Sequence, residues 1–326
     1  MILFCVILRS QEGAYLRHYT LSIATGLALI AITGFAQTPA ISQASYKVQK
    51  TAKVGGDGGF DYVYADVDGR KLYVARSGPS PRVAAFNLDT FDSAGEIPKT
   101  NARGAATDTK SHHGFASSNP VAMWDTKTLA LIKTIPVEGR PDGILNDPFN
   151  HHVYIFSHSA PNATVIDAKD GTVLGTIDLG GAPEQAVTDG KGHIYVDIED
   201  KDTVAVVDAK TMKVTAQYSL NGKGGGNAGL AIDVKNEVLF VACRNPQTMV
   251  MLSAKDGKYL SDLPIGRGCD GAVFNPKTGE CFSSQGDGTL TVIKEKSPTS
   301  FEVEHRFVLL EDLNRRSAGQ FSRASI

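Results

Sequence analysis

The chain has 326 residues and is nearly neutral, because 33 Lys and Arg face 35 Asp and Glu for a formal charge of −2. This balance excludes a global attraction to nucleic acid or acidic lipid, although it leaves room for a local charged patch. With 33 Gly, 14 Pro and 42% hydrophobic residues, the composition excludes a disordered chain and is typical of a turn-rich globular protein.

The N-terminal region has the pattern of a secretory signal peptide. A basic pair precedes the apolar run "LSIATGLALIAI" at 21–32, and small residues follow it up to Ala36, as at a cleavage site. We therefore expect residues 1–36 to be a signal peptide, residues 37–45 a linker, and the mature protein periplasmic or secreted with no membrane span. A retained anchor is the alternative, but the apolar run is short for a bilayer span.

From residue 46 onward the sequence repeats itself six times. An Asp or Asn ends one short apolar strand and opens a turn at intervals of 39 to 44 residues, and these marks are Asp66, Asp108, Asp147, Asp189, Asp233 and Asn275. Six or seven residues later comes an aromatic residue, in the order Tyr73, Phe115, Tyr154, Tyr195, Phe240 and Phe282. Each unit then continues into a second turn, which indicates four short antiparallel strands per repeat.

A unit of this kind cannot bury both faces of its own sheet, whereas a ring of such units can. The sequence therefore predicts an all-β fold, a β-propeller of four-stranded blades over residues 46–307, with negligible helix. The aromatic column is expected to wedge between neighbouring blades. An open β-sandwich is the alternative fold, but it gives no reason for so regular a period.

Three of the repeats carry the phrases "KLYVAR", "IYVDI" and "LFVACRN", each followed by a hairpin of the form V-x-V-apolar-D-x-x-T. These phrases resemble the YVTN-type β-propeller repeat family. "GGFDYV" and "IDLGGAPEQAVTDGKGHIYVDIEDK" are similar to its YncE-like periplasmic members, and the likeness runs from about residue 53 to about 307. The resemblance implies a seven-bladed ring in the periplasm or at the cell surface, usually without enzymatic activity.

The C-terminal end departs from that family pattern. After "EVEHRF" a seventh repeat is expected, but residues 308–326 contain no hairpin and are interpreted as an aberrant, disordered tail of a truncated propeller. The strand "SYKVQKTAKV" at 45–54 is expected to be a spare strand of the last blade. The ring should then be open at the seventh position, with the aromatic face of blade six uncovered around Phe274 and Phe282.

Polar residues recur where each innermost strand begins, which is the mouth of a propeller channel. The column reads Asp61, Arg103, Asp142, Glu184, Asn227 and Asp270. One interpretation is a site for a cationic ligand or a divalent cation such as calcium, since these metal ions prefer oxygen ligands. The other is that these groups accept hydrogen bonds from loop N–H groups or solvate a wet channel.

The leading functional hypothesis is an exported, non-enzymatic propeller that binds a small ligand or a protein partner at this mouth. One alternative is a metal-assisted enzyme of the lactonase or lyase type, although no catalytic residues are identified. Another is a propeller that binds single-stranded nucleic acid, for which only "GRKLYVARSGPSPR" at 69–82 offers a basic and aromatic stretch.

The remaining histidines and cysteines receive structural interpretations. The pairs His112-His113 and His151-His152 fall in turns that should point away from the mouth, so we expect no metal there. Cys243 and Cys269 should lie at the same end of the ring, with Cys281 toward the opposite end. A disulfide between Cys243 and Cys269 is predicted if their Cα atoms lie within about 7 Å.

Overall fold

The structure is a computed structural model that describes residues 3–9, 46–55 and 57–308. The chain divides into two compact units, residues 1–55 and residues 56–326. The described part of the first unit is an antiparallel pair of strands, β1 (Leu3–Arg9) and β2 (Tyr46–Lys53).

This pairing corrects one expectation from the sequence. The strand Tyr46–Lys53 was expected to be a spare strand without a strand to pair with, but its backbone bonds to Leu3–Arg9. The prediction was wrong because it treated the first residues only as part of a cleaved segment. Residues 10–45, with the apolar run, the cleavage position and the linker, and residues 309–326, with all but the first residue of the predicted tail, lie outside the described residues. Within the described ranges, no helix is long and apolar enough to cross a membrane.

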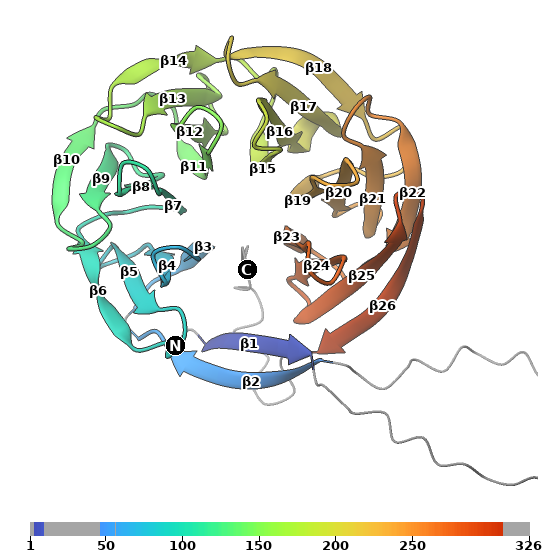
Figure 1. Ribbon diagram of the computed structural model, residues 1–326, viewed down its shortest axis with the longest axis horizontal. Coiled ribbons are helices and arrows are strands. Elements are labelled where there is room, and N and C mark those ends of the chain that lie inside the picture. The colour runs from blue at the N-terminus through green and yellow to red at the C-terminus, as the bar shows by residue number, and fades with distance from the viewer. Residues whose placement is uncertain (1–2, 10–45, 56, 309–326) are drawn as a thin grey trace, which may run out of the picture. The chain divides into compact units, whose positions relative to one another are not determined.

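The second unit contains six four-stranded antiparallel sheets, and each sheet is a meander of consecutive strands. Figure 1 shows these blades following one another around a central axis. From the innermost strand outward, the first three blades are β3 (Phe60–Asp66), β4 (Lys71–Arg76), β5 (Arg82–Asn87) and β6 (Ser93–Pro98); β7 (Ala105–Asp108), β8 (His113–Ala116), β9 (Val121–Asp125) and β10 (Leu131–Ile135); and β11 (Pro141–Asp147), β12 (His152–Ser157), β13 (Ala163–Asp167) and β14 (Val173–Ile177).

The other three blades continue in the same order. They are β15 (Pro183–Thr188), β16 (His193–Ile198), β17 (Thr203–Asp208) and β18 (Lys213–Ser219); β19 (Asn227–Asp233), β20 (Val238–Cys243), β21 (Thr248–Ser253) and β22 (Tyr259–Pro264); and β23 (Cys269–Asn275), β24 (Glu280–Gln285), β25 (Thr289–Ser297) and β26 (Ser300–Val308). Among the described residues the one helical segment is the single 3-10 turn Glu199–Lys201, so the all-β prediction is confirmed.

The repeating Asp residues terminate the innermost strands because their side chains hold the next turn. Asp66, Asp108 and Asp189 accept hydrogen bonds from the backbone N–H groups of Gly69, Ser111 and Lys191 at 2.8, 2.7 and 2.7 Å. A short side-chain carboxylate can satisfy a turn N–H in this way, which explains the choice of Asp at this position. The period in the sequence is thus the period of a hydrogen-bonded turn.

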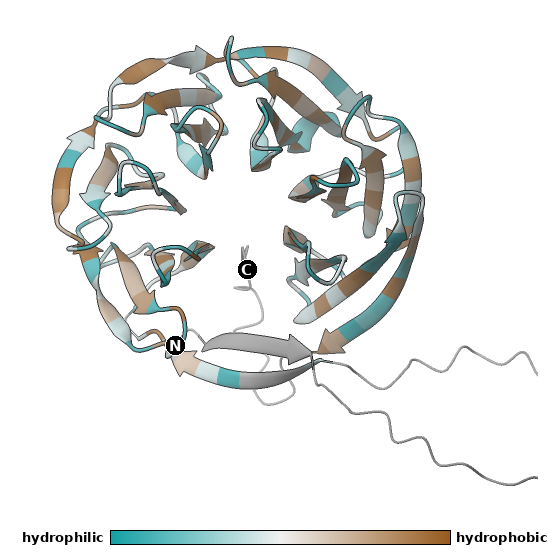
Figure 2. Cartoon of the chain, in the orientation of Figure 1, coloured by the Kyte–Doolittle hydropathy of each residue, from teal (hydrophilic) through white to brown (hydrophobic). Residues whose placement is uncertain are grey.

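The aromatic column forms the wedges predicted from the sequence. All six aromatic rings are at most 9% exposed. Five of them lie in five separate hydrophobic cores, and each core lies between the blade that carries the ring and the next blade along the chain. Tyr73 of blade one, for example, packs on Trp124 of blade two with ring centroids 5.6 Å apart. Figure 2 shows hydrophobic residues along the middle strands of the blades and hydrophilic residues in the loops.

Five interblade cores join six blades, and no core in residues 57–308 joins blade six to blade one. The opening expected at the seventh position of the ring stays a prediction. The expected exposed aromatic face is absent from the described residues. Phe274 stacks on Phe240 of blade five with centroids 5.3 Å apart, and Phe282 is only 9% exposed. That prediction was wrong for both rings, and the ring of Phe274 packs against the core that blade six shares with blade five.

Candidate functional site at the channel mouth

The mouth of the second unit is built from the first residues of the innermost strands. Asp61, Asp142, Glu184 and Asp270 are each the second residue of such a strand, in blades one, three, four and six. Gly143 follows Asp142, and a Cβ added there would meet the Glu184 carbonyl oxygen at 2.8 Å. Glycine therefore lets β11 and β15 approach closely enough to bring their two carboxylates together.

Two cationic side chains at this mouth were missed by the sequence analysis, namely His158 and Arg244. Each comes directly after the second strand of its blade, since β12 ends at Ser157 and β20 ends at Cys243. Because the first two strands are antiparallel, the second ends where the first begins. A comparison of the residues that directly follow the second strand of each repeat would have identified both.

His158 links the two carboxylates of blades three and four. Its Nε2 lies 3.1 Å from Asp142 Oδ2 and 3.5 Å from Glu184 Oε1. Glu184 is 3% exposed and is the most buried member of this group. These three side chains therefore form a compact cluster that spans two blades.

Arg244 and Arg103 neutralise the remaining carboxylates. Arg244 pairs with Glu199 and, through Nη2, with Asp270 Oδ1 at 3.0 Å, while its Nε donates to the Cys269 carbonyl oxygen. Arg103 Nη1 lies 3.3 Å from Asp61 Oδ2. The predicted residues Asp61, Arg103, Asp142, Glu184 and Asp270 thus all belong to ion pairs around one mouth.

Burial sets the protonation of these acids. It raises the pKa of Glu184 to about 8, against the lowering effect of the hydrogen bond from His158. Burial also raises the pKa of Asp270 to about 6, opposed by Arg244. Hydrogen bonds to Asp142 and Glu184 raise the pKa of His158 to about 10, so its ring is charged at neutral pH. Three cationic side chains are therefore paired with five acids at this mouth.

Asn227 is the one predicted site residue that the structure places elsewhere. Its side chain is fully buried, and its Nδ2 donates to Asp197 Oδ1 at 2.9 Å and to the Thr203 carbonyl oxygen at 3.0 Å. Burial raises the pKa of Asp197 well above its usual value, so this contact is a structural bond between blades four and five. Asn227 is therefore not available to a ligand at the mouth.

The cysteines lie where the sequence placed them but do not form the predicted disulfide. Cys243 ends β20 and Cys269 begins β23, at the mouth end, whereas Cys281 lies near the start of β24 at the other end. All three are buried free thiols. Cys243 packs in the core between blades four and five and Cys269 in the core between blades five and six, so each thiol is held in a separate apolar cluster.

The other singled-out residues have structural partners away from the mouth. His151 Nδ1 lies 2.8 Å from Asp108 Oδ1, and His113 Nδ1 lies 2.8 Å from the Ala168 carbonyl oxygen, both contacts between blades. In the basic stretch 69–82, Arg70 pairs with Asp89, Arg82 pairs with Glu96 and Arg76 is fully buried. This stretch therefore gives no support to a nucleic-acid surface.

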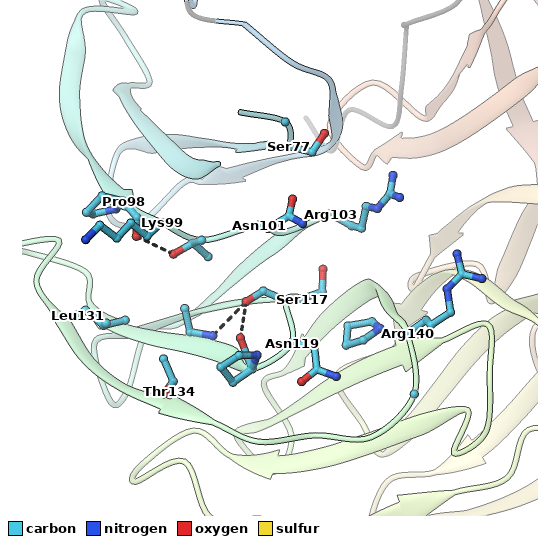
Figure 3. A pocket seen from close by; sticks show the side chains of 17 residues that line it. Ser77, Pro98, Lys99, Asn101, Arg103, Ser117, Asn119, Leu131, Thr134 and Arg140 are labelled. Carbon is cyan, nitrogen blue, oxygen red and sulfur yellow. Dashed lines mark hydrogen bonds between the residues drawn. The ribbon is translucent and has the colours of Figure 1, made fainter. Parts of the chain in front are cut away.

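A cavity of about 820 Å³ opens at the mouth end between blades one, two and three. Its charged lining residues are Lys99, Arg103 and Arg140, and the rest of the lining is mostly hydroxyl, amide and proline side chains with no carboxylate. Figure 3 shows the guanidinium groups of Arg103 and Arg140 at one end of the cavity and Lys99 at the other. Within residues 57–308 neither Lys99 nor Arg140 makes an ion pair. The charged residues that line this cavity are therefore all cationic.

Comparison with known proteins shows the fold. No family model and no curated protein matches the sequence. A propeller chain in the crystal structure of a mitotic checkpoint complex superposes with a TM-score of 0.64 over 78% of each chain, at 12% sequence identity. The chain therefore shares the β-propeller architecture with that protein.

Proposed function

We propose that the protein is an exported, non-enzymatic β-propeller that binds a small ligand carrying a carboxylate or phosphate group at its mouth end. The observation that supports this most is the cavity of about 820 Å³ with three cationic and no acidic lining residues. A volume of this size lies in the usual range for small-molecule sites, about 300–1,000 Å³. We also propose that the chain belongs to the YVTN-type family, which its repeat phrases resemble.

The chemistry of the lining supports an anionic group. Two guanidinium groups at one end can receive two oxygen atoms each in a planar arrangement, and this geometry suits carboxylate and phosphate. Ser77, Asn101 and Asn119 supply further donors around them. Arg103 is already paired with Asp61, so of the two arginines that line the cavity Arg140 is the one whose charge is not compensated by a carboxylate within residues 57–308.

The experiment is titration calorimetry with citrate and with inorganic phosphate at constant ionic strength. We expect saturable binding of one anion and a loss of at least about tenfold in affinity for Arg140→Gln, since a charge-assisted hydrogen bond contributes about 1.5–3 kcal/mol. The matched control is Arg267→Gln, which removes an exposed arginine near the start of β23, also at the mouth end but outside the cavity lining. No binding of either anion, or equal losses in both variants, would contradict the proposal.

Export rests on the sequence pattern of residues 21–36. Expression in a host with a secretion pathway, followed by mass determination of the N-terminus, tests it. We expect a mature chain that begins at Gln37 and is recovered outside the cytoplasm.

A further inference from the structure

The cluster of Asp142, His158 and Glu184 has the composition of a metal site. One ligand atom from each residue can be chosen so that all three lie within 4.8 Å of one another. They come from three separate segments: the start of β11, the loop after β12 and the start of β15. Folding of two blades is therefore needed to assemble the set.

The spacing of these atoms fits a transition metal ion. Ligand bonds of about 2.0–2.2 Å to zinc place neighbouring ligand atoms about 3.0–3.5 Å apart in octahedral or tetrahedral geometry. The observed separations from His158 Nε2 are 3.1 Å to Asp142 Oδ2 and 3.5 Å to Glu184 Oε1. Two of the three separations therefore already match the spacing of metal ligands, and the third pair of atoms, from Asp142 and Glu184, lies within 4.8 Å.

The imidazole nitrogen decides the class of ion. Calcium and magnesium take oxygen ligands, whereas imidazole with carboxylates suits zinc and neighbouring transition metals. Calcium was expected from the carboxylates of this mouth, and the imidazole of His158 changes that expectation. Two carboxylates and one imidazole leave coordination positions for water or for a ligand atom.

We propose that Asp142, His158 and Glu184 bind one divalent transition metal ion of the zinc class. The ion would lie between the same three ligand atoms, so metal binding and the ion pair of His158 with the two carboxylates are alternative states of the same cluster. This proposal is independent of the anion cavity, because Lys99, Arg103 and Arg140 are not ligands of the ion.

The test is calorimetry of the untagged, chelator-treated full chain with zinc chloride, together with the visible absorption of the cobalt-loaded protein. We expect one zinc ion per chain and, for His158→Gln, at least about a tenfold loss of affinity and a loss of the cobalt bands. Asp142→Asn should weaken binding as well, and it serves as a second variant if the first does not fold.

The matched control is His151→Gln, because His151 also pairs with one carboxylate but belongs to no group of three ligands in the described residues. It should leave zinc affinity unchanged. The absence of zinc binding, undiminished binding in His158→Gln, or displacement of zinc by an equal concentration of calcium would overturn the proposal. Arg140→Gln should still bind zinc, which separates this result from failure of the anion site.

Discussion

At the residue scale, the packing of Trp124 inside blade two depends on a glycine at the paired position of the neighbouring strand. Gly114 lies in β8, and a Cβ added there would overlap the indole ring of Trp124, which is fully buried. We expect Gly114→Ala to lower the free energy of unfolding by about 1–3 kcal/mol, because overpacking forces buried side chains off their rotamers. Gly175→Ala in β14 is the control, since its nearest neighbour would be Met212 Cε at 3.8 Å. Equal urea denaturation midpoints for both variants would contradict this.

A second prediction at this scale concerns the pH dependence of stability. Glu295 is 8% exposed, and burial raises its pKa to about 7, with Asn236 donating a hydrogen bond to it at 2.8 Å. A carboxyl group with a raised pKa contributes its stability at low pH and loses it as pH rises through the folded value.

The native chain should therefore lose free energy of unfolding as the pH rises from about 4.5 to about 7, whereas Glu295→Gln lacks this titrating group and should not show the loss. The expected relative change is on the order of 1–3 kcal/mol. Urea denaturation of both proteins at pH 4.5 and pH 7.5 measures it. Curves that stay parallel across this range would show that Glu295 titrates normally.

At the element scale, one side chain connects the innermost strands of three blades. Gln185 of β15 donates from Nε2 to the Ala272 carbonyl oxygen at 2.9 Å, and its Oε1 accepts from the N–H groups of Leu230 and Ala272 at 3.0 Å each. Gln185→Ala should destabilise the chain by about 1–3 kcal/mol, because the partner backbone groups lose their bonds. Gln217→Ala removes two hydrogen bonds of the outer strand β18, one from Thr203 that is exposed and one to the Leu179 carbonyl oxygen that is partly buried, and should lower the melting temperature less than Gln185→Ala does. Equal losses of stability in the two variants would show that the bonds of Gln185 to the innermost strands of blades five and six have no special role.

The elements also show how far the sequence can predict this molecule. The four-stranded repeats, the buried aromatic column and the gathering of Asp61, Asp142, Glu184 and Asp270 all follow from one period of about 42 residues. His158 and Arg244 were missed because they lie in loops after the second strands, where no apolar pattern marks them. Asn227 was wrongly assigned to the mouth, because its place in the repeat predicts that it lies where a strand begins but does not predict which way its side chain points.

At the scale of the whole molecule, the predicted cleavage of the signal peptide would affect the pairing of β1 with β2. Cleavage after Ala36 would remove Leu3–Arg9 and leave Tyr46–Lys53 without the strand to which it bonds. Amide hydrogen exchange in β2 should then be faster in a chain that begins at residue 37 than in the full chain, since unpaired backbone amides exchange readily. Equal protection in both chains would show that β2 has another partner after cleavage.

We propose that the mouth end of this propeller binds a small anionic ligand between blades one, two and three. The sharpest test of this binding is a crystal structure of the full chain grown with saturating citrate. We expect citrate within hydrogen-bond distance of both Arg103 and Arg140, with its third carboxylate directed toward Lys99. Citrate bound elsewhere on the unit, or a cavity that contains only water at saturating citrate, would contradict it.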